Sequence, residues 1–430
     1  MIRSAEVFLW GTRIGVVYQG ENDIAAGFEY DKDFLKSGIE PAPFKMPLAD
    51  NIYTFPELSR SEAFHGLPGL VADSLPDKFG NAVIDQWLSM HGRTPESFTA
   101  VERLCYTGTR GMGALEYVPD KGPQSINKSI DVDEMVEFAA KVLDNREQQT
   151  INDSDMDMLQ MIEIGSSAGG ARAKAVIAWN EKTGEVRSGQ IEAGDGFDYW
   201  LIKFDGVNGN GDHGVKDPKQ YTLIEYAYYL MAKDTGIDMS ECRIFDKEGL
   251  KHFMTRRFDR RDGRKVHMQT LSALGHFDFN YPNQCSYEMY AQYARRLGIG
   301  KKGIEELYRR MVFNVAGVNC DDHVKNFTFL MDMKGSWNLS PAYDLCFSYS
   351  PRNRWINAHQ MSVNGRTKEI SYNDLMECGK TMGLNASKCK DIIERVGKTV
   401  ADWMLYADKC GINEKRALEV SKLLNEKGIH

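Results

Sequence analysis

The apolar pattern changes along this chain, from short strand-like runs in its middle to helical periodicity in its second half. After about Asn283 nearly every segment is predicted to be helical, apart from one hairpin near Phe327–Asn338. A helical pattern at Thr222–Ala232 interrupts the middle region. The runs with strand character are Ala175–Trp179, Tyr199–Phe204, Cys242–Phe245 and Phe253–Phe258. This order predicts a β-containing lobe followed by a helical lobe.

The region before these lobes has a pattern of its own. Val7–Trp10 and Ile14–Tyr18 flank a Gly-Thr turn and predict a hairpin, and a helical pattern follows around Asn81–Met90. Tyr117–Asn127 contains two prolines and a glycine, which indicates a linker, and Asp131–Gln160 has the pattern of an acidic helix. At about 100–200 residues per domain, the length is enough for two to four domains. We expect an N-terminal subdomain at 1–120, a β-containing N-lobe at 121–260 and a helical C-terminal lobe at 261–430.

The charge balance bears on the class of ligand. Fifty-three Lys and Arg residues against 61 Asp and Glu residues give a formal net charge of −8. A protein that binds DNA by itself is usually basic, because its affinity comes from cations at the phosphates, so nucleic acid is disfavoured as the direct ligand. No run reaches the ~18 apolar residues that cross a bilayer. The eight cysteines include no C-x-x-C pair. The sequence predicts a soluble cytoplasmic protein.

A small-residue loop, GSSAGGARAK, runs from Gly165 to Lys174 directly before a predicted strand. Its glycines allow positive φ angles and let backbone N–H groups approach phosphate oxygens. The loop is not a Walker motif, since Gly170 is followed by Ala171 and Arg172. A tight surface turn is the alternative interpretation.

Lys203 lies in the otherwise apolar strand segment YWLIKFDG. A lysine there is costly to bury unless it meets an anion, and protein kinases use a strand lysine to contact ATP phosphates. Glu225 on the following helix could pair with it. The alternative is a lysine on the solvent face of an edge strand.

The segment NCDDHVKNFTFL, residues 319–330, carries the strongest set of polar residues. Asp321 and Asn326 are five apart, as are the catalytic Asp and the metal-binding Asn of the kinase loop. Lys325 adds a cation, and Asp344 follows a predicted hairpin that would return the chain to Asn326, where the two could share Mg²⁺. The alternative is that these are loop and turn residues. His323 is expected to be an oriented loop residue and not a metal ligand.

Taken together, GSSAGGARAKA, FMTRRFDR (253–260), DDHVKNFTF and LSPAYDL (339–345) resemble the HipA family of serine/threonine kinases, the toxins of type II toxin–antitoxin systems. LPDKFGN and GTRGMGALEY extend the resemblance to the N-terminal third. The resemblance implies an α+β chain, with a two-lobed protein-kinase-like fold, an added N-terminal α/β subdomain and a helical C-terminal lobe.

The resemblance also implies roles for single residues. Asp321 would be the catalytic base, with Lys325 in the same loop, and Asn326 and Asp344 would hold Mg²⁺. Ser167, or the adjacent Ser166, would be the autophosphorylation site. Arg256 stands where well-known members carry a glutamate, so we expect the adenine contact from the backbone. The nucleotide would contact Gly169, Gly170, Ala171, Arg172, Ala173, Lys174, Lys203, Arg256, Arg257, Phe258, His323, Val324, Lys325, Asn326, Tyr343 and Asp344.

The sequence therefore predicts an ATP- and Mg²⁺-dependent protein serine/threonine kinase that acts as a bacterial toxin. Its target would be a translation component such as an aminoacyl-tRNA synthetase. A small helix-turn-helix antitoxin would neutralise it and carry the DNA binding. A small-molecule phosphotransferase is the first alternative. A pseudokinase that acts as a binding module or corepressor is the second, although it would have no need of Lys203, Asp321, Asn326 and Asp344 together.

Overall fold

The computed structural model describes residues 2–76, 78–90, 92–122, 129–144, 172–190, 192–207, 220–261 and 263–429. The glycine-rich loop up to Ala171 lies outside the described residues, and with it Ser166, Ser167, Gly169 and Gly170. The predicted helix at Asp131–Gln160 can be followed only as far as residue 144.

The N-terminal subdomain is built on a five-stranded antiparallel sheet with the strand order β4-β3-β2-β1-β5. The predicted hairpin is confirmed as β1 and β2. Its strands are β1 (Ser4–Leu9), β2 (Thr12–Tyr18), β3 (Gly27–Tyr30), β4 (Ile52–Thr54) and β5 (Leu115–Val118). The helices are α1 (Gly69–Ala72), α2 (Lys78–Met90) and α3 (Ala100–Thr107). Because β5 includes Tyr117 and Val118, the linker predicted from Tyr117 begins two residues too early.

The middle sheet has the order β7-β6-β8-β10-β9, and all four pairings are antiparallel. All four predicted strands are confirmed within it. Its strands are β6 (Lys174–Trp179), β7 (Val186–Ser188), β8 (Asp198–Lys203), β9 (Cys242–Lys247) and β10 (Leu250–Arg256). The helices beside it are α4 (Val132–Asp144) and α6 (Tyr221–Thr235). One buried apolar cluster joins Phe79 and Val83 of α2 to this sheet, so α2 belongs to the core of the middle sheet as much as to the subdomain.

The C-terminal half is mainly helical. A three-stranded sheet, β13-β14-β15, contains the predicted hairpin, and β13 adds a third strand from earlier in the chain. The strands are β11 (Arg260–Arg261), β12 (Arg264–Lys265), β13 (His267–Thr270), β14 (Thr328–Met331) and β15 (Trp337–Leu339). The helices are α7 (Leu271–Gly275), α8 (Tyr287–Arg296), α9 (Lys301–Ala316), α10 (Tyr372–Thr381), α11 (Ala386–Ala401), α12 (Trp403–Lys409) and α13 (Glu414–Lys427).

One long segment contradicts the prediction that nearly everything after Asn283 is helical. Residues 340–371 form neither a helix nor a named strand. They are held by isolated bridges such as Asn319 to Ser348 and Ser286 to Ser362. Helix resumes only at α10, where the side chain of Ser371 caps the backbone N–H of Asp374 in a capping box.

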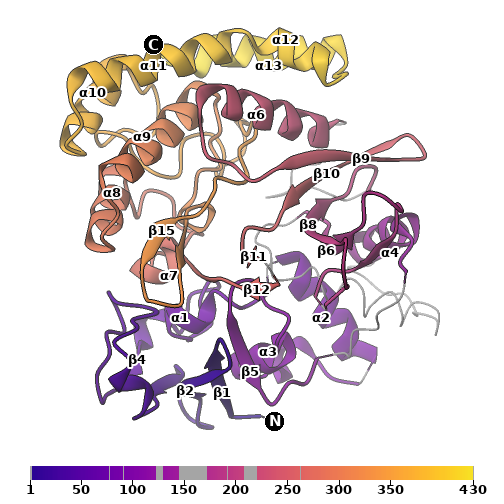
Figure 1. Cartoon of the computed structure of the whole chain (residues 1–430), viewed down its shortest axis with the longest axis vertical. Coiled ribbons are helices and arrows are strands. Elements are labelled where there is room, and N and C mark those ends of the chain that lie inside the picture. Colours follow the sequence, from indigo (N-terminus) through magenta and orange to yellow (C-terminus); the bar gives the residue numbers. More distant parts are fainter. Residues whose placement is uncertain are drawn as a thin grey trace.

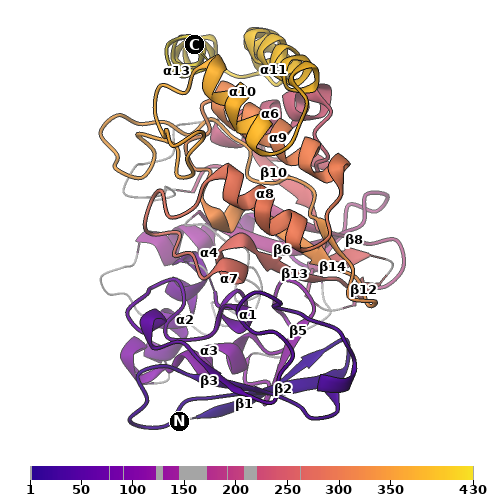
Figure 2. The same cartoon turned by 90° about the vertical axis from the view of Figure 1, so that its left-hand side faces the viewer.

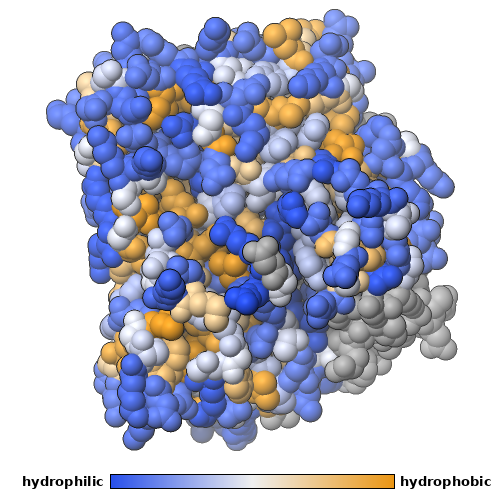
Figure 3. Space-filling view, in the orientation of Figure 1, coloured by the Kyte–Doolittle hydropathy of each residue, from blue (hydrophilic) through white to orange (hydrophobic). Residues whose placement is uncertain are grey.

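The molecule is elongated, with the N-terminal subdomain at one end and α10–α13 at the other (Figures 1 and 2). The middle sheet lies beside the column of C-terminal elements between these two ends. Figure 3 shows one face on which hydrophilic residues predominate and apolar residues form separate patches. Among the described residues, no helix combines the length and apolar character that crossing a membrane requires.

Candidate active site

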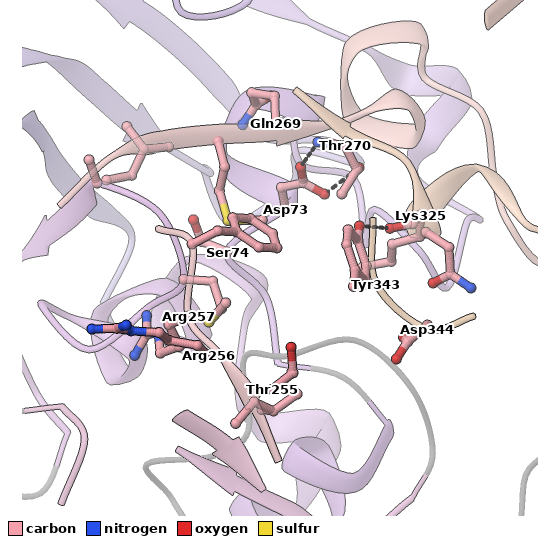
Figure 4. A pocket seen from close by; sticks show the side chains of 17 residues that line it. Asp73, Ser74, Thr255, Arg256, Arg257, Gln269, Thr270, Lys325, Tyr343 and Asp344 are labelled. Carbon is pink, nitrogen blue, oxygen red and sulfur yellow. Dashed lines mark hydrogen bonds between the residues drawn. The ribbon is translucent and has the colours of Figure 1, made fainter. Parts of the chain in front are cut away.

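A cavity lies where the N-terminal subdomain, the middle sheet and the C-terminal lobe meet (Figure 4). Sites for small molecules and cofactors are often found at such junctions between domains. The subdomain contributes Asp73, Ser74, Met112, Ala114 and Leu115, and the middle sheet with its following segment contributes Leu201, Thr255, Arg256, Arg257 and Phe258. The C-terminal lobe contributes Met268, Gln269, Thr270, Lys325, Asn326, Tyr343 and Asp344.

Lys203 links two carboxylates at this cavity. It is the last residue of β8, and its ammonium group donates to Glu225 of α6 at 2.6 Å and to Asp344. Lys203 and Glu225 are largely removed from water, at 8% and 1% exposed, whereas the Asp344 side chain is about a quarter exposed at the cavity. The alternative of a solvent-facing edge lysine is therefore wrong, because β8 lies between β6 and β10.

The charges of this cluster support one another. Burial acts to lower the pKa of Lys203, but the carboxylates of Asp344 and Glu225 outweigh it and raise the pKa above its usual value. Burial acts to raise the pKa of Asp344, and the neighbouring Lys203 brings it below its usual value. For Glu225 burial dominates and raises the pKa, against the lowering effect of Lys203. The cluster therefore holds a charged lysine beside an ionised Asp344.

Lys174 brings a second cation to the same place. It is directly opposite Lys203 in the antiparallel pairing of β6 with β8, so the two side chains lie on one face of the sheet. Lys174 is buried, and its charge contributes to the lowered pKa of Asp344. Arg172, two residues earlier, stacks on the ring of Tyr221 with its guanidinium 3.4 Å from the ring centroid. Ala173 is fully buried beneath the sheet.

The backbone of Asp344 adopts a left-handed conformation, with φ of 52°. Residues other than glycine rarely do so, and such strain gathers at functional sites. The preceding Tyr343 fixes the segment to the loop that contains Asn326. Its hydroxyl donates to the carbonyl oxygen of Lys325 at 2.8 Å and lies 2.6 Å from the hydroxyl of Thr328. The predicted return of the chain from Asn326 to Asp344 is thus observed, and both residues line the cavity.

The segment from Asp321 to Asn326 folds back on itself. Val324–Asn326 is a single 3-10 turn, η4, and the side-chain amide of Asn326 donates to the carbonyl oxygen of Asp321 at 2.8 Å. The Asp321 carboxylate is about a quarter exposed and lies 3.9 Å from Nε2 of His323. Asp321 does not line the cavity itself.

The neighbouring Asp322 is fully buried and acts as an anchor. Its carboxylate accepts from the Tyr287 hydroxyl at 2.7 Å and from the Gln360 backbone N–H at 2.7 Å. Nδ1 of His359 lies 2.9 Å from the same carboxylate. The loop is thereby held by α8 on one side and by the segment 340–371 on the other.

The segment Arg256–Phe258 borders the cavity, as the resemblance implied, but its two guanidinium groups face elsewhere (Figure 4). Arg256 pairs with Asp198 at the surface, and Arg257 makes two bonds to buried Asp259, at 2.7 and 2.9 Å. At the cavity, this segment therefore presents its backbone and the ring of Phe258. That ring lies 5.7 Å from the ring of Tyr343, centroid to centroid.

Sequence reasoning missed the part that the N-terminal subdomain plays in this cavity. Asp73 accepts from the backbone N–H and the hydroxyl of Thr270, at 2.6 and 2.8 Å, and Met112 comes from the turn Gly108–Gly113. Burial raises the pKa of Asp73. An aspartate in the stretch VADSLP and a methionine between glycines carry no local pattern of a binding site, so only the fold could reveal them.

The arrangement combines two kinds of surface. Leu201, Met112, Met268 and the rings of Phe258 and Tyr343 can cover a flat apolar ligand. The other side presents Lys325, Asn326 and Asp344, with Lys203 behind Asp344. Cations beside an oxygen-rich pair suit a ligand with anionic groups and a hard divalent cation.

Comparison with known proteins gives two family matches. The family model of the HipA N-terminal domain matches residues 5–118, and that of the HipA-like C-terminal domain matches residues 166–404. Among solved structures, HipA of the Shewanella oneidensis MR-1 toxin–antitoxin system, determined with HipB and its operator DNA, has a TM-score of 0.67 at 15% identity. The match covers 98% of this chain and 95% of that chain. This likeness confirms the expected mixed helix-and-sheet fold with a helical C-terminal region.

Two curated proteins are related over shorter stretches. A protein of Haemophilus influenzae is 24% identical over 216 residues, which are 42% of this chain and 63% of that protein. The protein Y4dM of Sinorhizobium fredii is 29% identical over 150 residues, which are 30% of this chain and 36% of that protein. Both carry provisional names as kinases. The matched part of the chain spans less than two thirds of either relative.

Proposed function

Because this chain belongs to the HipA family, we propose that it is an ATP- and Mg²⁺-dependent protein serine/threonine kinase. One observation carries the proposal. The ammonium group of Lys203 on a strand bonds Glu225 of a helix and Asp344 at a cavity wall. Protein kinases require the same combination, a strand lysine paired with a helix glutamate and a nearby metal-binding aspartate.

In this proposal Lys203 contacts the phosphates of ATP, and Asn326 and Asp344 hold Mg²⁺. The donor set fits the ion, because Mg²⁺ is commonly bound by one or two protein oxygens together with phosphate oxygens and water. Among the described residues, no group of three or more His, Cys, Asp or Glu side chains could hold a metal unaided. When bound, the ion would neutralise charge on the phosphates.

Asp321 would accept the proton of the acceptor hydroxyl, since its carboxylate is partly exposed at the edge of the loop that holds Asn326. General-base assistance of this kind contributes about 10²–10⁴-fold to a rate. Lys325 would offset negative charge on the group in transfer. The base of the nucleotide would lie between the apolar walls of the cavity near Phe258 and Tyr343.

The cellular role is proposed from the relatives. The solved relative from Shewanella is part of a toxin–antitoxin system with HipB and operator DNA. We propose that this chain is likewise a toxin, neutralised by a small helix-turn-helix antitoxin that binds the DNA. The acceptor would be a translation component such as an aminoacyl-tRNA synthetase, and Ser167 or Ser166 would be phosphorylated in cis or by a second copy.

Transfer of phosphate from ATP to protein tests the proposal. Purified protein is incubated with ATP and either Mg²⁺ or EDTA, and its intact mass is measured over time. Gain of phosphate only with Mg²⁺, lost in Asp321→Asn, is the expected result. Turnover of ATP only upon addition of sugars or aminoglycosides would instead favour a small-molecule phosphotransferase. Nucleotide binding without any turnover would favour a pseudokinase.

A further inference from the structure

A loop rich in aromatic residues borders the Asp321–Asn326 segment on one side. This aromatic loop, Phe277–Gln284, places the ring of Phe279 5.5 Å from the ring of His323 and 5.2 Å from the ammonium of Lys325. Tyr281 at its tip is 60% exposed, so its ring is available to a ligand.

The aromatic loop is held firmly. The Asp278 carboxylate accepts from the hydroxyl of Ser61 at 2.5 Å, and from the backbone N–H and side-chain amide of Asn280 at 2.9 and 3.0 Å. The backbone N–H of Asp278 in turn donates to the side chain of Gln284 at 2.9 Å. A ligand that contacts Tyr281 would therefore meet a surface that is already ordered, which lowers the entropic cost of binding.

A basic loop, Ser350–Ala358, belongs to the segment that follows Asp344. Arg352 and Arg354 are exposed on it, and the Arg354 guanidinium stacks on Trp355 at 4.6 Å from the ring centroid. Within the described part of the chain neither arginine has a carboxylate within 4.0 Å. Buried Asn353 fixes the turn, because its side-chain oxygen accepts from the backbone N–H of Trp355 at 2.9 Å.

Residues that flank the basic loop, Ser348 and Gln360, connect it to the aromatic loop and to the residues on either side of Asp321. The backbone N–H of Asn283 donates to the carbonyl oxygen of Gln360 at 2.8 Å, and the N–H of Gln360 donates to buried Asp322. The backbone N–H of Cys320, next to Asp321, donates to the carbonyl oxygen of Ser348 at 2.9 Å. The residues on either side of Asp321 are thus bonded to residues next to the basic loop, and the aromatic loop is bonded to the same stretch of chain.

We propose that the aromatic loop and the basic loop form the docking surface for an acidic segment of the acceptor protein. The inference rests on the proposed kinase function and adds the chemical class of the acceptor. A ligand that reaches Tyr281, Asp321 and the arginine pair at once must be extended, as a segment of polypeptide is. Two exposed arginines that have no carboxylate partner among the described residues favour Asp and Glu near the phosphorylated hydroxyl.

The test uses the full-length protein and an array of peptides with one central Ser or Thr. The flanking positions carry Asp and Glu, Lys and Arg, or neutral residues, and transfer of labelled phosphate from ATP is measured. The quantity of interest is the ratio of labelling between acidic and basic peptides, which does not depend on overall activity. We expect the ratio to be well above one in the wild-type protein. It should fall about fivefold in Arg352→Glu/Arg354→Glu, since an exposed ion pair contributes only modestly and two are lost.

A matched control reverses two remote charges. Lys398→Glu/Lys409→Glu changes the net charge equally on exposed positions of α11 and α12 and should leave the ratio unchanged. A second variant, Tyr281→Ala, should reduce labelling of all peptides without changing the ratio. Thermal unfolding of each variant establishes that it is folded.

Several results would overturn the docking surface. These are a wild-type ratio near one, an unchanged ratio in the arginine variant, or labelling of no peptide by a protein that phosphorylates itself. Loss of all labelling on addition of total tRNA, whatever the peptide, would assign the arginines to nucleic acid. Absence of both self-labelling and ATP turnover would instead refute the proposed function on which the inference rests.

Discussion

Two adjacent carboxylates, Asp321 and Asp322, have different surroundings and hence different proposed tasks. The first is partly exposed and close to His323, whereas the second is buried and accepts bonds from α8 and from the segment 340–371. A base that meets an acceptor hydroxyl must be reachable from solvent. A carboxylate with three partners and no exposure serves instead to hold the backbone in place.

Substituting each carboxylate by its amide should separate the two roles. Asp321→Asn keeps the shape but removes the proton acceptor, so the protein should bind nucleotide while phosphate transfer falls by about 10²–10⁴-fold. In Asp322→Asn the amide N–H group would face a hydrogen-bond donor that the carboxylate now accepts from. The free energy of unfolding should therefore fall by about 1–3 kcal/mol. Urea unfolding and single-turnover transfer measure the two effects. A loss of transfer smaller than tenfold in Asp321→Asn would count against its role.

Asp344→Ala removes the proposed metal ligand and leaves Lys203 with Glu225 alone. Transfer should be abolished, and ATP should bind more weakly in the presence of Mg²⁺ but not in EDTA, because only the metal-dependent part of the affinity is lost. Titration calorimetry under the two conditions provides the measurement. Asp246→Ala, at an exposed aspartate of β9, is the matched control. Undiminished turnover in folded Asp344→Ala would refute the metal assignment.

At the scale of elements, regular structure could be predicted where the hydrophobic period is strong. The hairpin β1–β2, the strands β6, β8, β9 and β10 and the helix α6 follow local patterns, so the sequence suffices for them. The segment 340–371 could not be predicted, because its backbone groups pair with distant partners such as Asn319 and Ser286. For the same reason β13 escaped notice, since it is completed by β14 about 60 residues later.

The same limit holds for the candidate site. Lys203 could be picked out because it interrupts an apolar strand, Asn326 because it stands five residues after Asp321, and Asp344 because it follows a predicted hairpin. Asp73, Met112 and Thr270 could not, because they reach the cavity through packing of the N-terminal subdomain against the C-terminal lobe. Residues 165–171 lie outside the described part of the chain, so the proposed contacts of Gly169, Gly170 and Ala171 with the nucleotide remain predictions.

Phosphorylation of the serines in the glycine-rich loop is expected to switch the proposed kinase off. A phosphoserine carries close to two negative charges at pH 7 and three acceptor oxygens, which would compete with ATP for the cations at the start of β6 and repel the nucleotide. Phosphorylation at Ser167 should therefore shut the enzyme down. Intact-mass measurement after incubation with ATP and Mg²⁺ should find phosphate in the wild-type protein and none in Ser166→Ala/Ser167→Ala. Phosphate found only outside this pair of serines would contradict the switch.

At the scale of the whole molecule, buried polar groups fasten the N-terminal subdomain to the rest. Asp259 bonds Arg257 and Arg260 and accepts from the backbone N–H of Gly113 in the subdomain at 2.8 Å. Burial acts to raise the pKa of Asp259, but the two arginines bring it far below its usual value. Since Met112 of the same turn lines the cavity, movement of the subdomain would change the cavity too. A partner that binds the subdomain could thus alter the proposed nucleotide binding without contacting the nucleotide.

Two histidines at this junction should make it sensitive to acid. Burial lowers the pKa of His267 to about 4 and that of His276 to about 3. His267 lies 3.3 Å from the carbonyl oxygen of Pro41, and Nε2 of His276 accepts from the backbone N–H of Gly69 at 3.1 Å. Both are therefore neutral in the folded protein. In the unfolded chain each binds a proton below its ordinary pKa of about 6.5.

Between these pKa values the unfolded state binds more protons than the folded state, so stability falls as the pH is lowered from 6.5 toward 4. Each histidine contributes up to about 1.4 kcal/mol per pH unit in this range. Urea unfolding at a series of pH values should give a shallower slope below pH 6.5 for His267→Gln/His276→Gln, because glutamine can replace the neutral donor and acceptor without titrating. Above pH 7 the free energy of unfolding should depend on pH in the same way in the variant and in the wild-type protein. An equal slope below pH 6.5 would mean that acid acts on the molecule elsewhere than at this junction.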